Sequence, residues 1–319
     1  MPPFLPRRTG AHAPPLKIQG IKTRLVPWIA ESIHWQGDGR WVEPFMGSCA
    51  VALNIAPARA LLADSNPHIV RFYQQLQNGA IDARIVRQFL EEEGAALLRK
   101  GETHYYDVRD RFNARGDPLD LLFLNRACFN GMMRFNGKGH FNVPFCRKPE
   151  RFRPALITRI CNQIAWAASI IRENDWVFKC QPWPDTLAAV APGDFVYLDP
   201  PYVGRHAGYH SQWEAEQADR LAHAVKGLPT RFAYSMWKAN RYRSNAHLPK
   251  HFAGYRIETT AHFYHLGASE RLRNGMQEAL VIGPAAGRAA CGPTPQAPVA
   301  SSLPSQASAS SWFSRPSSC

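Results

Sequence analysis

The stretch Phe195-Val196-Tyr197-Leu198-Asp199-Pro200-Pro201-Tyr202 sets the interpretation of this sequence, because an apolar run ends abruptly in an acid and a double-proline turn. Four consecutive apolar or aromatic residues are typical of a buried strand. Ligands of open α/β sheets bind beyond the carboxyl ends of the strands, so residues 199–202 are predicted to lie at a ligand-binding edge. The alternative is an ordinary strand-ending turn, since Asp and Pro are common turn residues.

The chemistry of residues 199–202 suits methylation of an exocyclic amine. The amino nitrogen of adenine is a poor nucleophile because its lone pair is conjugated with the ring. The Asp199 carboxylate and the Pro200 carbonyl can accept its two N–H hydrogens, which pulls the nitrogen toward tetrahedral geometry and frees the lone pair for in-line attack on a sulfonium methyl. Pro200 and Pro201 fix the turn, and Tyr202 offers an aromatic face to an extruded base. These four residues are our candidate catalytic residues.

Apolar runs elsewhere indicate further strands of the same sheet. Residues 41–42 and 60–63 each stop at an acid, Glu43 and Asp64, and a helix-like run lies between them. Strand, helix and strand at this spacing form a βαβ unit, which implies a parallel sheet. Other strand patterns lie at 176–178, 232–234, near 254–264 and at 279–282. The fold class predicted is therefore α/β.

The loop that follows Trp41-Val42 carries a glycine, Gly47, just before the helix-like run. Glycine lets the backbone pass close to a ligand at a helix N-terminus. The G-x-G-x-x-G fingerprint is absent, so a nicotinamide or flavin cofactor is not supported. Asp64 ends the next strand, where a carboxylate can accept a pair of ribose hydroxyls.

Residues 124–147 mix basic and aromatic side chains, and within them we expect the glycine-containing, aromatic stretch 129–145 to form a hairpin or long loop. This mixture suits a loop that contacts phosphates and reads bases, and a hairpin that packs on the sheet is the alternative. We expect Arg134 to read a guanine, because arginine pairs with guanine bidentately, and Lys138 and Arg147 to contact phosphates. The candidate DNA-binding residues are Arg126, Arg134, Lys138 and Arg147.

Composition limits the class of protein. The chain has 319 residues, 45% of them hydrophobic, which suits one large domain or two coupled ones. Lys and Arg number 38 against 25 acids, for a formal net charge of +13. Such a charge attracts polyanions, of which nucleic acid is the commonest large one; a merely soluble basic protein or a membrane-surface binder is the alternative.

Long apolar runs and cysteine pairs are both missing from the sequence. No apolar run is long enough to cross a bilayer, and the N-terminus lacks the apolar core of a signal peptide, so we expect a cytoplasmic protein with no membrane partner. The seven cysteines include no C-x-x-C pair, so zinc and thioredoxin-like chemistry are unsupported and we predict no metal site.

Composition changes along the chain predict its domains. Residues 1–15 are Pro-rich and are expected to form a flexible arm, and residues 285–319, rich in Ala, Ser and Pro, a disordered tail. We predict a catalytic domain from residues 16–74 and 156–284. A mainly helical domain, residues 75–155, is inserted between these two parts.

Four segments together resemble the DNA adenine methyltransferase (Dam) family, the D12 class of N6-adenine methylases that includes enzymes of restriction–modification systems. They are EPFMGSCAVALN at 43–54, LLADSNPHIVRFY at 61–73, LNRACFNGMMRFNGKGHFNVPF at 124–145 and YLDPPY at 197–202, in the family's order. The resemblance implies a Rossmann-like, S-adenosylmethionine-dependent methyltransferase sheet with an inserted target-recognition domain. The cofactor-binding residues that it implies are Lys22, Glu43, Phe45, Asp64, Phe141 and Asp199.

The resemblance also implies the reaction and its partners. S-adenosylmethionine would be the cofactor, Tyr202 would stack on a flipped adenine, and double-stranded DNA would be the substrate of a monomeric enzyme. Residues 269–282 resemble restriction-type methylases more than the housekeeping enzyme, which implies a cognate restriction endonuclease as partner. Residues 18–22 differ from the family's Trp-Ala-Gly-Gly-Lys opening, although Lys22 is kept. The alternatives are an RNA adenine methyltransferase and a catalytically inactive DNA-binding protein on the same scaffold.

Overall fold

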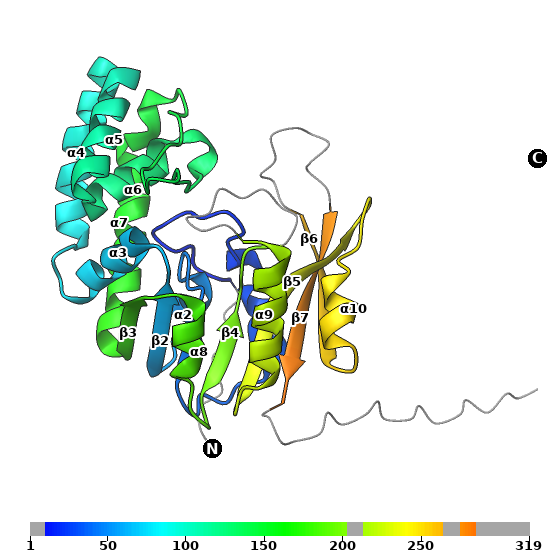
Figure 1. Ribbon diagram of the computed structural model, residues 1–319. Helices are drawn as coiled ribbons and strands as arrows, with labels where there is room; N and C mark the ends of the chain where they lie inside the picture. The colour runs from blue at the N-terminus through cyan, green and yellow to red at the C-terminus, as the bar shows by residue number, and fades with distance from the viewer. Residues whose placement is uncertain (1–9, 203–212, 264–274, 285–319) are drawn as a thin grey trace, which may run out of the picture.

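The sheet is the centre of this computed structural model, which describes residues 10–202, 213–263 and 275–284 (Figure 1). Within these residues seven strands pair in the order β3-β2-β1-β4-β5-β7-β6. Strand β7 is antiparallel to both of its neighbours, whereas the first five strands in this order are parallel. The predicted α/β fold is confirmed. The strands are β1 (Trp41–Glu43), β2 (Arg59–Asp64), β3 (Asp175–Cys180), β4 (Phe195–Leu198), β5 (Arg231–Asn240), β6 (Arg256–Phe263) and β7 (Gly275–Gly283).

Helices cover both faces of this sheet. Among the described residues they are α1 (Val26–Ile33), α2 (Ala50–Ile55), α3 (Pro67–Gln77), α4 (Ala83–Lys100), α5 (Glu102–Arg115), α6 (Pro118–Ala127), α7 (Pro154–Glu173), α8 (Trp183–Ala188), α9 (Ala215–Lys226) and α10 (His247–Phe252). Three short 3₁₀ helices join them: η1 (Thr23–Leu25), η2 (Phe129–Gly131) and η3 (Pro149–Phe152).

Strand β4 shows why helices must pack on both faces of the sheet. Its four residues are all buried, and side chains alternate between the two faces of a strand. Phe195 and Tyr197 join the apolar cluster that contains α1, α2, α3 and α7. Val196 and Leu198 join the other cluster, which contains α8, α9 and α10. A continuous apolar run therefore marks a central strand, as in parallel sheets generally.

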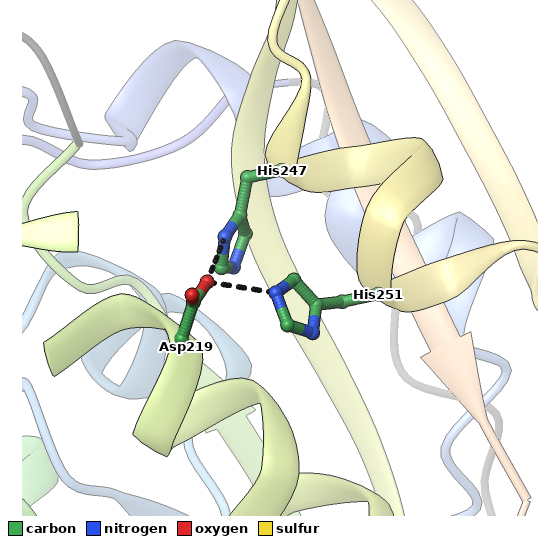
Figure 2. Close-up of side chains that lie close together, drawn as sticks. All are labelled: Asp219, His247 and His251. Atoms are coloured by element: carbon green, nitrogen blue, oxygen red, sulfur yellow. Dashed lines mark hydrogen bonds and ion pairs between the residues drawn. The ribbon is translucent and has the colours of Figure 1, made fainter. Parts of the chain in front are cut away.

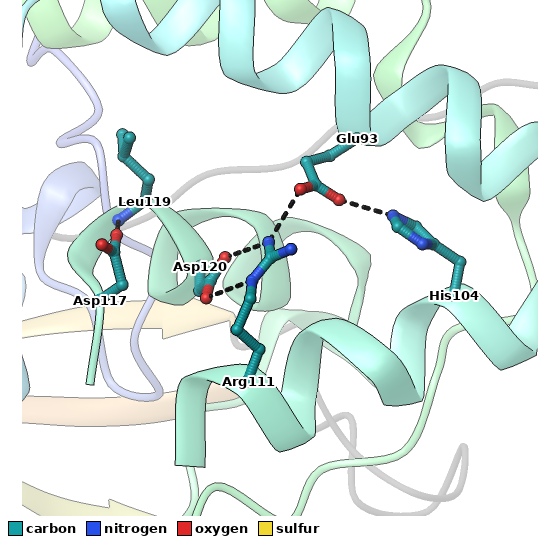
Figure 3. Close-up of polar contacts among 6 residues, drawn as sticks. All are labelled: Glu93, His104, Arg111, Asp117, Leu119 and Asp120. Atoms are coloured by element: carbon teal, nitrogen blue, oxygen red, sulfur yellow. Dashed lines mark hydrogen bonds and ion pairs between the residues drawn. The ribbon is translucent and has the colours of Figure 1, made fainter. Parts of the chain in front are cut away.

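Helices α4, α5 and α6 pack together beyond the β3 side of the sheet (Figure 1). A polar network ties them to one another (Figure 3). Arg111 of α5 donates to Asp120 of α6 at 2.9 Å and to Glu93 of α4 at 2.8 Å, and a Glu93 oxygen lies 2.6 Å from Nε2 of His104. Asp117 caps α6, because its Oδ1 accepts a hydrogen bond from the backbone amide of Leu119.

These three helices lie within the predicted inserted domain, residues 75–155. The boundaries predicted at residues 74/75 and 155/156 fall inside α3 and the first turn of α7. Side chains of both helices belong to the same buried cluster as those of the inserted helices. The division into two domains therefore stays a prediction.

Residues 10–15 are not the flexible arm that the sequence predicted. The amide of His12 donates to Oδ1 of Asn54, whose Nδ2 donates back to the His12 carbonyl. The His12 ring stacks on Trp166 with centroids 5.0 Å apart, and Pro14 and Pro15 are buried. Proline-rich composition predicts a lack of regular hydrogen bonding, but it does not exclude docking on an apolar surface. The rest of the arm and the predicted tail, 285–319, lie outside the described residues.

None of the helices in the described ranges has the length and apolar character that crossing a membrane requires.

Candidate active site

A cavity of about 460 Å³ lies at the carboxyl ends of strands β1, β2 and β4. The strand order reverses beside β1, since β2 pairs with one of its edges and β4 with the other. Ligands of open α/β sheets bind at such a switch point, and the volume lies within the range of small-molecule sites. The predicted residues that line the cavity are Lys22, Glu43, Phe45, Asp64, Asp199, Pro200, Pro201 and Tyr202.

Lys22 and Asp199 form an ion pair at the base of the turn. The Lys22 Nζ lies 2.9 Å from Oδ1 of Asp199, donates to the Gly20 carbonyl, and lies 4.9 Å from the centroid of the Tyr202 ring. The Lys22 side chain is only 3% exposed and that of Asp199 22%. Burial raises the pKa of Asp199, and the charge and hydrogen bond of Lys22 oppose this rise. Lys22 thus favours the ionised form of the carboxyl group.

Glu43 ends strand β1 and is buried below this pair. Its Oε1 accepts a hydrogen bond from the Trp41 indole at 2.8 Å. Burial, reinforced by the negative charge of Asp199, raises the pKa of Glu43 to about 8. At neutral pH its carboxyl group is therefore mostly protonated, so it adds little negative charge to the cavity.

Asp64 ends strand β2 and joins two loops. Its Oδ2 accepts a hydrogen bond from the backbone amide of Gly47 at 3.0 Å, and its Oδ1 accepts one from the backbone amide of Asn66 at 2.9 Å. Gly47 has φ of +47°, a conformation that favours glycine. Asn66 in turn caps α3, because its Oδ1 accepts a hydrogen bond from the backbone amide of His68. Through these two amides Asp64 links the loop after β1 to the start of α3.

Two aromatic residues that line the cavity, Tyr202 and Phe45, make further contacts. The Tyr202 hydroxyl donates to Oε2 of Glu278, a fully buried residue of β7, at 2.6 Å. The Phe45 ring meets Trp213 edge-on, with centroids 5.6 Å apart. Sequence reasoning missed both residues: Glu278 lies within residues 269–282, where only a family resemblance was noted, and Trp213 lies beyond the Asp-Pro-Pro-Tyr motif.

Phe141 is not in the cavity, so its prediction as a cofactor residue is wrong. It is buried within the inserted helices and packs edge-on against Phe112 and Phe135. Its amide donates to the Asn113 side chain, which donates back to its carbonyl. Phe135 and Met133 line the cavity instead. Phe135 and Phe141 are paired across an antiparallel bridge, as the predicted hairpin requires.

Arg126 is also misassigned, because its side chain is buried and cannot contact DNA. One guanidinium nitrogen donates to the Pro15 carbonyl and to Oε1 of Gln163. Burial lowers the pKa of Arg126 to about 10. Its role is to attach the docked N-terminal segment to α6 and α7.

The other three predicted DNA-binding residues lie at or near the surface. Arg134 is half-buried and donates to Oδ1 and to the carbonyl oxygen of Asn142. These contacts use two of its five N–H donors. Lys138 and Arg147 are exposed, Lys138 at the tip of the hairpin. Their contacts with DNA stay predictions.

A mixed α/β sheet with this strand order, and a cavity walled by an Asp-Pro-Pro-Tyr turn at its switch point, defines a methyltransferase fold. Comparison with known families is more specific: the chain belongs to the D12 class N6 adenine-specific DNA methyltransferases, whose family model matches residues 19–266.

Relatives with assigned names agree with this family. The chain is 33% identical over 202 residues to the retron Ec67 DNA adenine methylase of Escherichia coli, a match covering 61% of this chain and 66% of that protein. It is 32% identical over 224 residues to the DNA adenine methylase of Serratia marcescens, covering 67% and 77%. The DNA adenine methylase of Escherichia coli K12 is 32% identical over 206 residues, covering 60% and 68%.

Proposed function

We propose that this protein transfers a methyl group from S-adenosylmethionine to the exocyclic N6 of an adenine that is flipped out of double-stranded DNA. The observation that carries the proposal is the position of Asp199: its carboxylate lies at the cavity, paired with Lys22, on a turn that begins where β4 ends. The net charge of +13 and the exposed Lys138 and Arg147 suit a polyanionic substrate.

The cavity residues fit S-adenosylmethionine. Asp64 places a carboxylate at the cavity, where it would accept hydrogen bonds from ribose hydroxyls, and Ile69, Met133 and Phe135 supply apolar walls for a purine ring. Asp199 provides negative charge that suits a sulfonium cation. When bound, the cofactor supplies an electrophilic methyl group.

The residues of the turn would prepare the amine. The Asp199 carboxylate accepts one N–H hydrogen and the Pro200 carbonyl the other, which localises the lone pair on the nitrogen. Lys22 occupies Oδ1 of Asp199, so Oδ2 is the oxygen available to the amine. The hydrogen bond from Tyr202 to Glu278 fixes the ring on which the base would stack.

The decisive experiment is the Asp199→Asn variant, assayed by transfer of labelled methyl groups to duplex DNA. Asparagine keeps the shape of the side chain but removes the charge, and we expect the rate to fall on the order of 100-fold or more. Asp110→Asn, a change at an exposed residue of α5, is the control and should keep its activity. A folded Asp199→Asn variant with nearly unchanged turnover would contradict the proposal.

The same assay separates the alternatives. Methylation of single-stranded RNA in preference to duplex DNA would indicate an RNA adenine methyltransferase. Binding of DNA without any transfer would indicate an inactive DNA-binding protein. The monomeric state, the cytoplasmic location and the cognate restriction endonuclease stay predictions from the sequence.

A further inference from the structure

Three side chains converge between helices α9 and α10, apart from the residues of the proposed reaction (Figure 2). Asp219 belongs to α9, and His247 and His251 belong to α10. One oxygen, Oδ1 of Asp219, lies 3.2 Å from Nδ1 of His247 and 2.7 Å from Nε2 of His251. One ligand atom from each residue lies within 4.8 Å of the others.

The spacing of the two histidines explains this convergence. Residues four apart lie on one face of a helix, one turn above each other. Pairs of histidines at this spacing bind zinc on helices of metalloproteases. Zn–N and Zn–O bonds of about 2.0–2.2 Å place neighbouring tetrahedral ligands roughly 3.3–3.6 Å apart. The observed separations of 2.7 and 3.2 Å are shorter than this range, so the side chains would move apart by a few tenths of an ångström to admit an ion.

We propose that Asp219, His247 and His251 bind one divalent transition-metal ion, Zn²⁺, which fastens α10 to α9. Two imidazole nitrogens and one carboxylate oxygen form a ligand set suited to zinc, with the remaining coordination position taken by water. The sequence predicted no metal site because that prediction considered only cysteine pairs, and Asp219 is remote from the two histidines.

The surroundings of the three ligands fit such a site. The side chains of His251 and His247 are 4% and 12% exposed, whereas that of Asp219 is 33% exposed, so an ion can enter from the Asp219 side.

Lys250 opposes metal binding by its charge. Its Nζ lies 2.7 Å from Oδ2 of Asp219, the carboxylate oxygen that does not contact the histidines. Because the Lys250 side chain is 59% exposed, solvent screens this repulsion, and the ion and the lysine can share the carboxylate. The competing explanation is that the two histidines only donate hydrogen bonds to Asp219.

Metal titrations of the full-length, chelator-treated protein would distinguish these explanations. Co²⁺, followed by its visible absorption, should bind with one ion per chain. Zn²⁺ well above its dissociation constant should raise the melting temperature by about 5 °C. Both effects should be lost in His251→Gln and His247→Asn, whose amides can still donate to Asp219.

Two further variants complete the test. His223→Gln is the matched control, because the His223 ring packs against His251 but its Nδ1 contacts only the backbone carbonyl of Asp219. It should keep metal binding. Lys250→Gln should tighten binding several-fold, up to about tenfold, by removing a positive charge. The proposal is overturned if the folded wild-type protein binds no metal, or if His251→Gln and His247→Asn bind as tightly as the control.

Discussion

Glu43 is the buried carboxyl whose titration can be measured most directly in this protein. Its pKa is raised from an ordinary value of 4.5 to about 8, chiefly by burial. The folded state therefore holds the Glu43 proton more tightly than the unfolded state does. Stability is highest below pH 4.5, falls as the pH rises from 4.5 to about 8, and is constant with respect to this group above that.

The Glu43→Gln variant removes this titration while keeping the shape and the neutral charge of the protonated acid. Between the two pKa values each pH unit costs the wild-type protein about 1.4 kcal/mol of unfolding free energy. From about pH 5.5 to pH 7.5 the loss is therefore about 2.7 kcal/mol, or roughly 4 °C in melting temperature for a chain of this size. The variant should not show this loss.

The assay is thermal unfolding of both proteins at a series of pH values, and the quantity compared is the difference in melting temperature. This difference cancels the titration of groups that do not interact with Glu43. Glu31→Gln, at an exposed residue of α1, is the control, and its melting temperature should change with pH as that of the wild type does. If the melting temperature of Glu43→Gln also changes with pH as that of the wild type does, then Glu43 is ionised in the folded protein and our account of the cavity charge is wrong.

Two further predictions concern ligands. Asp64→Ala should weaken S-adenosylmethionine binding by about 1–3 kcal/mol in calorimetry, because ribose hydroxyls would lose their acceptor; unchanged affinity would limit Asp64 to its contacts with the two loops. Arg134→Ala should relax sequence preference by about 1–3 kcal/mol at one position, whereas Lys138→Ala should weaken binding evenly and reduce its salt dependence. If Arg134→Ala loses the same binding affinity for cognate and scrambled duplexes, Arg134 does not read a base.

The sheet was predictable because its strands carry local signals. Residues 195–198 and 60–63 are apolar runs that each end at an acid, and burial on both faces of a parallel sheet selects such runs. The acids that end these strands lie at the predicted edge of the sheet, beside the cavity. Motifs attached to strand ends are therefore placed correctly by sequence reasoning.

The errors arose where the sequence leaves a side chain's direction open. The aromatic stretch 129–145 does not show which phenylalanines face the cavity, because that depends on the hairpin pairing of Phe135 with Phe141. Arg126 was judged by its charge. Helix α6 is apolar on nearly every face, and such a helix is buried, so this pattern indicated that Arg126 points inward.

The chemistry of the site depends on which of its carboxyl groups carries a charge. The negative charge of Asp199 raises the pKa of Glu43, that of Glu278 raises the pKa of Asp199, and burial opposes ionisation of both Asp199 and Glu43. The Lys22 ammonium pairs directly with Asp199, whereas Glu43 is held by a neutral indole donor. The Lys22 ammonium therefore favours ionisation of Asp199, whereas burial keeps Glu43 mostly protonated at neutral pH. Sequence departures at residues 18–21 leave this preference intact, because Lys22 supplies the charge and the Gly20 carbonyl orients it.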